Sequence, residues 1–155
     1  MIDIGHPAHV HYFRNLIKIL EQNGHKVLVT SRDKEVTLQL LLNYQIPFIN
    51  RGKGGSNPLT KILYILKADF ILLKAALKFR PDLLISFSTI YPAHVSTLIN
   101  KPYIGLTDTE HAKEQHLLFV PFCKHVLTPS SFKGDFGKKH IRFNSYMELS
   151  YLHPK

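Results

Sequence analysis

The 155-residue sequence predicts an α/β fold with a doubly wound, mostly parallel sheet of about six to seven strands. Short aliphatic and β-branched runs alternate with longer segments of helical period, and Gly, Pro, Asn or Asp marks each change. Runs such as Val27–Val29 and Leu83–Ile85 are continuously apolar, which is typical of parallel strands covered by helices on both faces. Because the crossovers between such strands are right-handed, a doubly wound sheet is the simplest topology.

Seven apolar or β-branched runs are expected to form strands. In chain order they are Met1–Ile4, Lys26–Ser31, Phe48–Asn50, Leu83–Ser86, Tyr103–Leu106, His125–Thr128 and Ile141–Asn144. The helices expected between them are Ala8–Asn23, Lys34–Asn43, Leu59–Phe79, Tyr91–Ile99 and Glu110–Phe122.

Two helix ends carry clear signals. Asn23 and Gly24 should end the first helix, because both residues tolerate a positive φ. Asn57 followed by Pro58 should begin the third helix, as a cap and a proline in the first turn. Pro81, Pro102 and Pro129 fall outside the expected helices.

Composition limits the class of protein. With 45% hydrophobic residues, the chain can form one domain with a substantial core. A net charge of +9 favours anionic partners such as phosphates, nucleic acid or acidic lipid headgroups. The single cysteine, Cys123, cannot form an internal disulfide and indicates a reducing, cytoplasmic location. Charged residues interrupt the apolar region 59–79, so no transmembrane helix is expected.

The candidate site lies just after the strands, because ligands of such sheets bind beyond the carboxyl ends of the strands. The stretch "GHPAHVH" follows the first strand. His9 and His11 are about 200° apart on a helix and cannot hold one metal ion together, so no metal site is expected. His6 and His9 could instead donate to phosphate or sugar hydroxyls, or act as acid or base. Alternatively, His6 only caps the turn and His11 lies on a solvated face.

Basic and glycine-rich segments follow the second and third strands. Arg51–Asn57 contains two cations and three glycines before a helix, and could hold a phosphate or carboxylate, although it matches no known phosphate fingerprint. A plain flexible loop is the alternative. Arg32 could neutralise a ligand, whereas Asp33 could simply cap the next helix. The candidate binding residues are Gly5, His6, His9, Arg32, Lys53, Gly54, Gly55 and Ser88.

Asp108, Glu110 and His111 form the best acid/base group, since two carboxylates and an imidazole share one strand-to-helix turn. The alternative is structural: Asp108 or Thr109 caps the helix and Glu110 is a favourable first-turn charge. His116 is expected on the surface.

The expected helix 59–79 is apolar over most of its circumference, with a narrow lysine strip formed by Lys67, Lys74 and Lys78. Such a helix could rest on an anionic membrane; the alternative is burial against the sheet with the lysines reaching solvent. Nucleic-acid binding is not expected, because the lysines are scattered and no binding motif occurs.

The opening "IDIGHPAHVHYFRNLIKILEQNGHKVLVTSRD" resembles the start of the DUF354 family, uncharacterised prokaryotic proteins that resemble GT-B glycosyltransferases and UDP-N-acetylglucosamine 2-epimerases. The resemblance continues through "LLNYQIPF", "GKGG", "RPDLLISF", "DTEH" and "SYMELSYLHP". It implies a Rossmann-like amino-terminal GT-B-type domain over residues 1–150, with residues 151–155 beginning the connection to an absent second domain. Family members usually have a few more residues before the first strand.

The resemblance implies the amino-terminal half of a sugar-nucleotide enzyme, a glycosyltransferase or epimerase that is incomplete alone. His6 and His9 would contact donor phosphate or acceptor, Arg32 and Lys53 would neutralise anionic groups, and Asp108, Glu110 or His111 would move a proton. No cofactor is expected. A non-catalytic binding module for a phosphorylated sugar or lipid-linked glycan, and an inactive gene fragment, are the alternatives. The expected ligand is a nucleotide-sugar or phosphorylated glycan; peripheral membrane contact and a homo-oligomer are left open.

Overall fold

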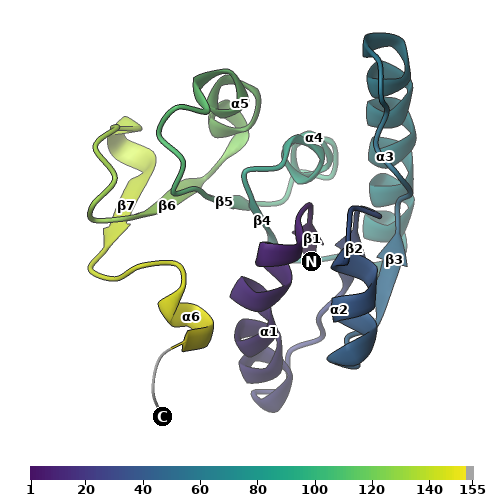
Figure 1. Ribbon diagram of the computed structural model, residues 1–155, viewed down its shortest axis with the longest axis horizontal. Helices are drawn as coiled ribbons and strands as arrows, with labels where there is room; N and C mark the ends of the chain where they lie inside the picture. Colours follow the sequence, from purple (N-terminus) through teal and green to yellow (C-terminus); the bar gives the residue numbers. More distant parts are fainter. Residues whose placement is uncertain (153–155) are drawn as a thin grey trace.

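The computed structural model describes residues 1–152 and contains one sheet of seven strands (Figure 1). Its spatial order is β3-β2-β1-β4-β5-β6-β7, and every neighbouring pair is parallel. The strands are β1 (Ile2–Ile4), β2 (Val29–Ser31), β3 (Phe48–Asn50), β4 (Leu84–Phe87), β5 (Tyr103–Leu106), β6 (His125–Pro129) and β7 (His140–Phe143). The predicted doubly wound sheet is confirmed, and it is parallel throughout.

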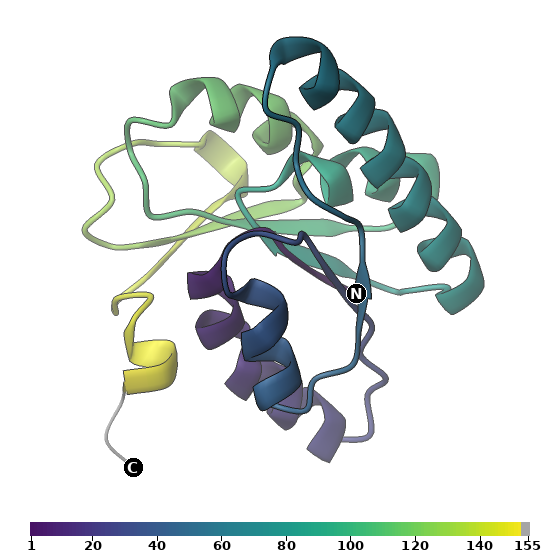
Figure 2. The ribbon, with the colours of Figure 1, turned by 45° about the vertical axis from the view of Figure 1, so that its right-hand side comes forward.

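Helices cover both faces of the sheet (Figure 2). The α-helices are α1 (Pro7–Gln22), α2 (Thr37–Asn43), α3 (Pro58–Phe79), α4 (Ile90–Leu98), α5 (Lys113–Phe119) and α6 (Leu149–Leu152). Two short 3₁₀ helices, η1 (Val120–Phe122) and η2 (Gly137–Lys139), precede β6 and β7. The first two helices cover one face, whereas α3, α4 and α5 cover the other.

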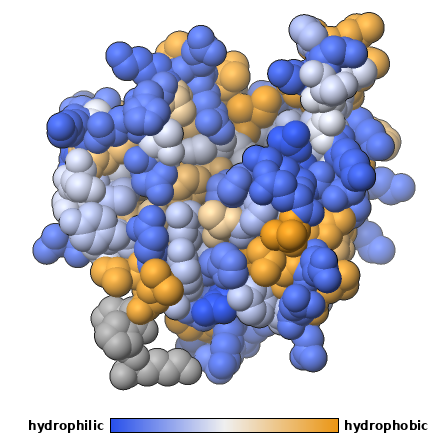
Figure 3. All heavy atoms as spheres, viewed as in Figure 1, coloured by the Kyte–Doolittle hydropathy of each residue, from blue (hydrophilic) through white to orange (hydrophobic). Residues whose placement is uncertain are grey.

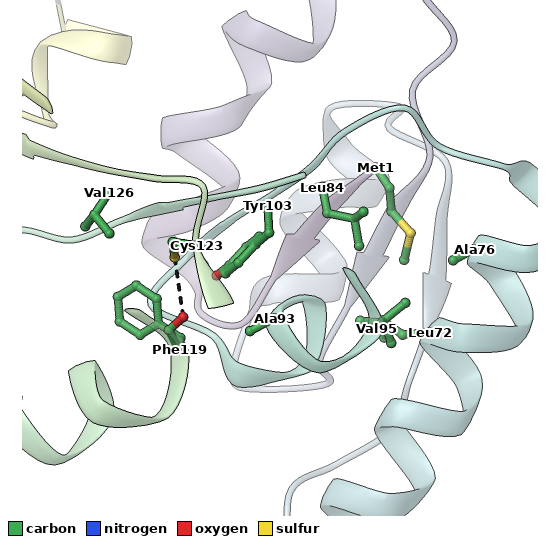
Figure 4. Close-up of a cluster of buried hydrophobic side chains, with 10 residues drawn as sticks. All are labelled: Met1, Leu72, Ala76, Leu84, Ala93, Val95, Tyr103, Phe119, Cys123 and Val126. Atoms are coloured by element: carbon green, nitrogen blue, oxygen red, sulfur yellow. Dashed lines mark hydrogen bonds between the residues drawn. The ribbon is translucent and has the colours of Figure 1, made fainter. Parts of the chain in front are cut away.

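Each face has its own hydrophobic core, because successive side chains of a strand point to opposite faces. Met1 belongs to the core under α3, α4 and α5, whereas Ile2 belongs to the core under α1 and α2. Figure 4 shows the first of these cores, in which Leu72 and Ala76 of α3 meet strand residues such as Leu84. The other core is built from Val10, Phe13 and Ile17 of α1, Leu41 of α2 and the strand residues Ile2, Ile4 and Val29.

Two predicted helix ends are confirmed. Asn23 is the C-cap of α1, and Gly24 follows it with a φ of +81°. At α3, the Asn57 side chain accepts from the Thr60 amide at 2.9 Å while the Thr60 hydroxyl accepts from the Asn57 amide at 3.1 Å, which is a capping box with Pro58 in the first turn.

Two predicted helix starts are wrong. α2 begins at Thr37 because Glu35 has a φ of +50°, which interrupts a helix, and the Asp33 side chain does not cap it. α5 begins at Lys113 rather than at Glu110, since the preceding turn is irregular.

The order of the strands creates a switch point. After β1 the chain runs to β2 and β3 on one side, and then returns to β4 on the other side of β1. The connections beyond β1 and β4 therefore diverge, and a crevice opens between the carboxyl ends of these two strands.

Candidate functional site

A cavity of about 410 Å³ lies at this switch point. The segments that follow β1, β2, β3, β4 and β5 all contribute to its wall. The lining residues are Gly5, His6, His9, Arg32, Lys34, Arg51, Phe87, Ser88, Thr89, Ile90, Tyr91, Thr109 and Gln115. Five of the eight predicted binding residues, Gly5, His6, His9, Arg32 and Ser88, are therefore brought together here.

His6 both caps α1 and lines the cavity. Its Nδ1 accepts from the Ala8 amide at 3.3 Å, and its carbonyl accepts from the His9 amide at 3.0 Å. The capping role that the sequence left open is therefore present. Because Pro7 has no N–H and these two amides already donate, the start of α1 offers a ligand fewer amides than its position predicts.

The His9 side chain lines the cavity as a neutral imidazole. Its Nδ1 accepts from the Gly5 amide at 3.3 Å, and its ring packs on Phe87 with centroids 4.8 Å apart. Burial, followed by the positive charges of His6, Lys34 and Arg51, lowers the pKa of His9 to about 3. With Nδ1 engaged as an acceptor, Nε2 carries the proton and can donate to a ligand.

His11 belongs to a different environment. Its Nδ1 lies 3.2 Å from the Tyr44 hydroxyl, and its ring packs on Tyr44 and Tyr151. His11 is therefore half-buried between these two tyrosine rings at the partly solvated side of α1.

The floor of the cavity is a buried ion pair. Arg51 Nε and Nη2 donate to Asp3 Oδ1 and Oδ2 at 3.0 and 3.1 Å, and both side chains have no exposed surface. Burial alone would lower the pKa of Arg51, but the Asp3 carboxylate outweighs it and holds the pKa above its usual value. This bidentate ion pair links β1 to the segment after β3.

Hydroxyl groups complete the shell around the ion pair. Thr30 Oγ1 donates to Asp3 Oδ1 at 2.7 Å, and Thr89 Oγ1 donates to Asp3 Oδ2 at 3.0 Å. Tyr91 lies under the Arg51 guanidinium, 4.3 Å from it to the ring centroid. With its hydrogen bonds satisfied, the pair forms a fixed base for the groups above it.

Arg32 lies above the Asp3–Arg51 ion pair and offers hydrogen-bond donors to a ligand. Its guanidinium lies over the Tyr64 ring, and its Nε is buried without a hydrogen-bond partner among residues 1–152. A Cβ added to Gly54 would stand 1.9 Å from Arg32 Nη2, so the absence of a side chain at Gly54 leaves room for Arg32. Together with Lys34, Arg32 makes the cavity wall cationic.

Ser88 holds an unusual backbone conformation at the end of β4. Its φ is +50°, in the left-handed region that non-glycine residues seldom adopt, and its amide donates to the Leu106 carbonyl at 2.9 Å. Gln115 of α5 donates to the Ser88 carbonyl. Strained backbone of this kind is often found where a fold shapes a ligand site.

Apart from Arg51, the glycine-rich segment after β3 does not line the main cavity but a neighbouring one of about 360 Å³. Lys53, Gly54 and Gly55 border it, with Lys53 exposed. A Cβ on Gly55 would lie 2.3 Å from the backbone of Thr60 and Lys61, so this glycine is required by the close approach of the loop to α3.

The predicted acid/base residues lie apart from the main cavity. Asp108 and Glu110 border a smaller cavity of about 230 Å³ together with Glu148, and His111 is exposed. Glu110 Oε1 accepts from the Lys133 amide at 2.8 Å, and Asp108 Oδ1 accepts from the Thr109 hydroxyl at 3.0 Å. From the same turn only Thr109 reaches the main cavity. Asp108, Glu110 and His111 remain predicted, not observed, proton-transfer groups.

Sequence reasoning missed part of the site and misplaced one histidine. Asp3 is not among the predicted site residues, although a carboxylate between Ile2 and Ile4 in a buried strand needs a cation or hydrogen-bond donors beside it. His116, predicted on the surface, is buried and its Nε2 lies 3.3 Å from Thr107 Oγ1. Burial lowers the pKa of His116. Among residues 1–152 no group of three or more His, Cys, Asp or Glu side chains could hold a metal ion.

Comparison with known families and proteins gives one family match and one curated relative. A family described as "Protein of unknown function (DUF354)" matches residues 1–146. The uncharacterised protein MJ0665 of Methanocaldococcus jannaschii is 27% identical over 154 residues, which is 96% of this chain but 45% of that protein. The chain thus spans less than half the length of this relative.

Solved structures share the fold at low identity. MurG of Acinetobacter baumannii has a TM-score of 0.75 at 16% identity, covering 91% of this chain and 44% of its own. A UDP-GlcNAc 2-epimerase of M. jannaschii, solved with UDP-GlcNAc and UDP, has a TM-score of 0.69 at 12% identity, covering 91% and 45%. A glycosyltransferase of Rickettsia africae has a TM-score of 0.59 at 16% identity, covering 91% and 41%. The fold is that of the amino-terminal domain of GT-B glycosyltransferases and UDP-GlcNAc 2-epimerases.

Proposed function

Since this chain belongs to the DUF354 family of proteins of unknown function, we propose its function from its own site: the cavity between β1 and β4 binds the phosphate-bearing part of a nucleotide-sugar or phosphorylated glycan. In a protein of the length of MJ0665, of which this chain covers 45%, such a domain would take part in glycosyl transfer or epimerisation.

The main support for this function is the positive charge of the cavity wall, which lies above the buried ion pair of Asp3 and Arg51. Asp3 already compensates Arg51, and Lys34 lies 3.6 Å from the exposed Glu35 carboxylate, so Arg32 is the main cation left for a ligand. The unpartnered Nε of Arg32 is a buried donor that an anionic oxygen would satisfy, and such a donor is costly to leave unpaired.

Neutral donors add selectivity for a sugar. His9 offers Nε2–H from a ring that stays uncharged at neutral pH, and the side chains of Thr109 and Gln115 border the same cavity. Neutral donors and acceptors suit hydroxyl groups, whereas the cations suit phosphate. Because the M. jannaschii epimerase was solved with UDP-GlcNAc and UDP, UDP-GlcNAc is the first ligand to test.

The test is an NMR titration of the labelled chain with UDP-GlcNAc. We expect saturable shifts at the amides of Gly5, His9 and Ser88, and at the Arg32 Nε–H. Separate titrations with UDP, inorganic phosphate and N-acetylglucosamine identify the part of the ligand that is recognised.

The Arg32→Ala variant should raise Kd at least tenfold, because it removes a charge-assisted donor pair. Arg14→Ala is the matched control, since the Arg14 Nε also lacks a hydrogen-bond partner in the described chain but Arg14 lies outside the cavity. Equal Kd values for the two variants, or a folded spectrum that does not move with any ligand, would refute the proposal.

A further inference from the structure

α3 exposes an apolar stripe on the side opposite the core. Tyr64, Ala68, Leu72, Ala75 and Ala76 of this helix are buried, whereas six large apolar residues are exposed. They are Leu59, Ile62, Leu63, Leu66, Phe70 and Leu77, each with 57–68% of its surface accessible. At about 100° per residue the six fall within about 100° of the helix circumference. The helix is therefore buried against the sheet on one side with its lysines in solvent, as one of the two sequence alternatives expected, but much of its apolar surface stays exposed.

The stripe lies at an edge of the molecule. α3 occupies the outer side of the domain in Figure 1, and its outward face is turned away from the sheet and α4 in Figure 2. Figure 3 shows apolar atoms at the upper right, where Figure 1 places the first turns of the helix. Exposed large apolar side chains gathered on one helix face often mark an interaction site.

Lysines border the stripe. Lys67, Lys74 and Lys78 project within about 40° of one another, along one side of the apolar residues. All three are exposed. The one acidic residue of α3, Asp69, bonds to His94 at 2.8 Å and so does not offset these charges on the outer face. The helix therefore presents an apolar strip with a cationic margin.

From this pattern we infer that α3 docks on the surface of an anionic lipid bilayer. The apolar strip would enter the boundary between headgroups and acyl chains, and the lysines would lie among anionic headgroups. None of the helices in residues 1–152 is long and apolar enough to cross a bilayer, so the contact is parallel to the surface. The net charge of +9 acts in the same direction.

A second copy of the chain fits this face less well. A two-fold dimer pairs the same patch on both subunits, and would bring six lysines to one interface without a free carboxylate on either α3. An anionic surface supplies the missing countercharge.

Vesicle co-sedimentation tests the inference. The purified chain is mixed with vesicles of phosphatidylcholine alone, or with about a third phosphatidylglycerol, at low and high salt. We expect binding to the anionic vesicles that salt weakens. Replacing Leu66→Asp and Phe70→Asp together should reduce the partition constant at least tenfold, whereas Leu98→Asp with Leu117→Asp should not, although these leucines of α4 and α5 are 67% and 74% exposed.

The lysines have a separate test. The triple variant Lys67→Gln, Lys74→Gln and Lys78→Gln should lose at least tenfold in binding and most of its preference for phosphatidylglycerol. Circular dichroism checks that every variant is folded. Equal binding of the wild type and the Leu66/Phe70 variant would overturn the inference. So would an absence of vesicle binding together with a dimer, measured by light scattering, that this variant abolishes. Arg32→Ala should bind vesicles normally, so failure of the ligand proposal leaves this test intact.

Discussion

Removing Arg51 should destabilise the domain more than most single substitutions. In the Arg51→Met variant, Asp3 keeps the hydroxyl donors of Thr30 and Thr89 but loses two charge-assisted bonds in a site with no exposed surface. Leaving one member of a buried pair uncompensated costs about 3–5 kcal/mol. Since a domain has about 5–15 kcal/mol of total stability, this is a large share of it.

Urea unfolding followed by circular dichroism measures the loss. With a slope of about 2 kcal/mol per M, the midpoint should fall by about 2 M. The matched control is Lys18→Met on the exposed side of α1, which should change the free energy of unfolding by less than about 0.5 kcal/mol.

A double-mutant cycle separates the ion pair from general damage. The double variant Asp3→Val with Arg51→Met removes both charges, so it should lose at least about 1 kcal/mol less than the sum of the two single variants. Strict additivity, or a loss below about 1 kcal/mol for Arg51→Met, would show that the pair does not support the floor of the cavity.

Four further predictions follow from the site and the core. The pKa of His9 is about 3 in the folded chain and near its ordinary 6.5 in the unfolded chain, so between these pH values only the unfolded chain binds a proton at His9. The free energy of unfolding should therefore fall as the pH drops from 6.5 towards 3. In urea titrations at several pH values, His9→Asn should make this fall smaller. Burial raises the pKa of Cys123 to about 12, so a thiol reagent should leave it unmodified in the folded chain at pH 8 and label it in urea; rapid native labelling would contradict this. Gly55→Ala should lower stability by about 1–3 kcal/mol because its Cβ meets α3 backbone, whereas Gly54→Ala should mainly weaken UDP-GlcNAc binding by displacing Arg32; the reverse order would refute both assignments. In a two-domain protein that contains this domain, Glu110→Gln should reduce turnover at least tenfold, and unchanged kcat would remove Glu110 from the mechanism.

Local patterns in the sequence were sufficient for the order and type of the main elements. Continuous apolar runs specify strands buried on both faces, and the Asn57–Pro58 and Asn23–Gly24 pairs specify helix ends through the backbone conformations that these residues favour. Both are short-range effects, so they can be recognised without knowing the rest of the fold. The switch-point rule then placed Gly5, His6, His9, Arg32 and Ser88 at one rim, and the structure joins them in one cavity.

Tertiary structure alone decided which charges are free and which surfaces are exposed. Asp3 and Arg51 are 48 positions apart, and only the order of β1, β2 and β3 brings them into contact. The turn with Asp108 and Glu110 follows a strand of the same sheet, yet the side chains face another cavity because β5 is one strand further from the switch point. The stripe on α3 has the apolar content of a buried helix, and its exposure depends on the absence of a packing element on its outer side in the described chain. Burial and pairing depend on contacts between distant segments, and helical or strand periodicity carries no information about those contacts.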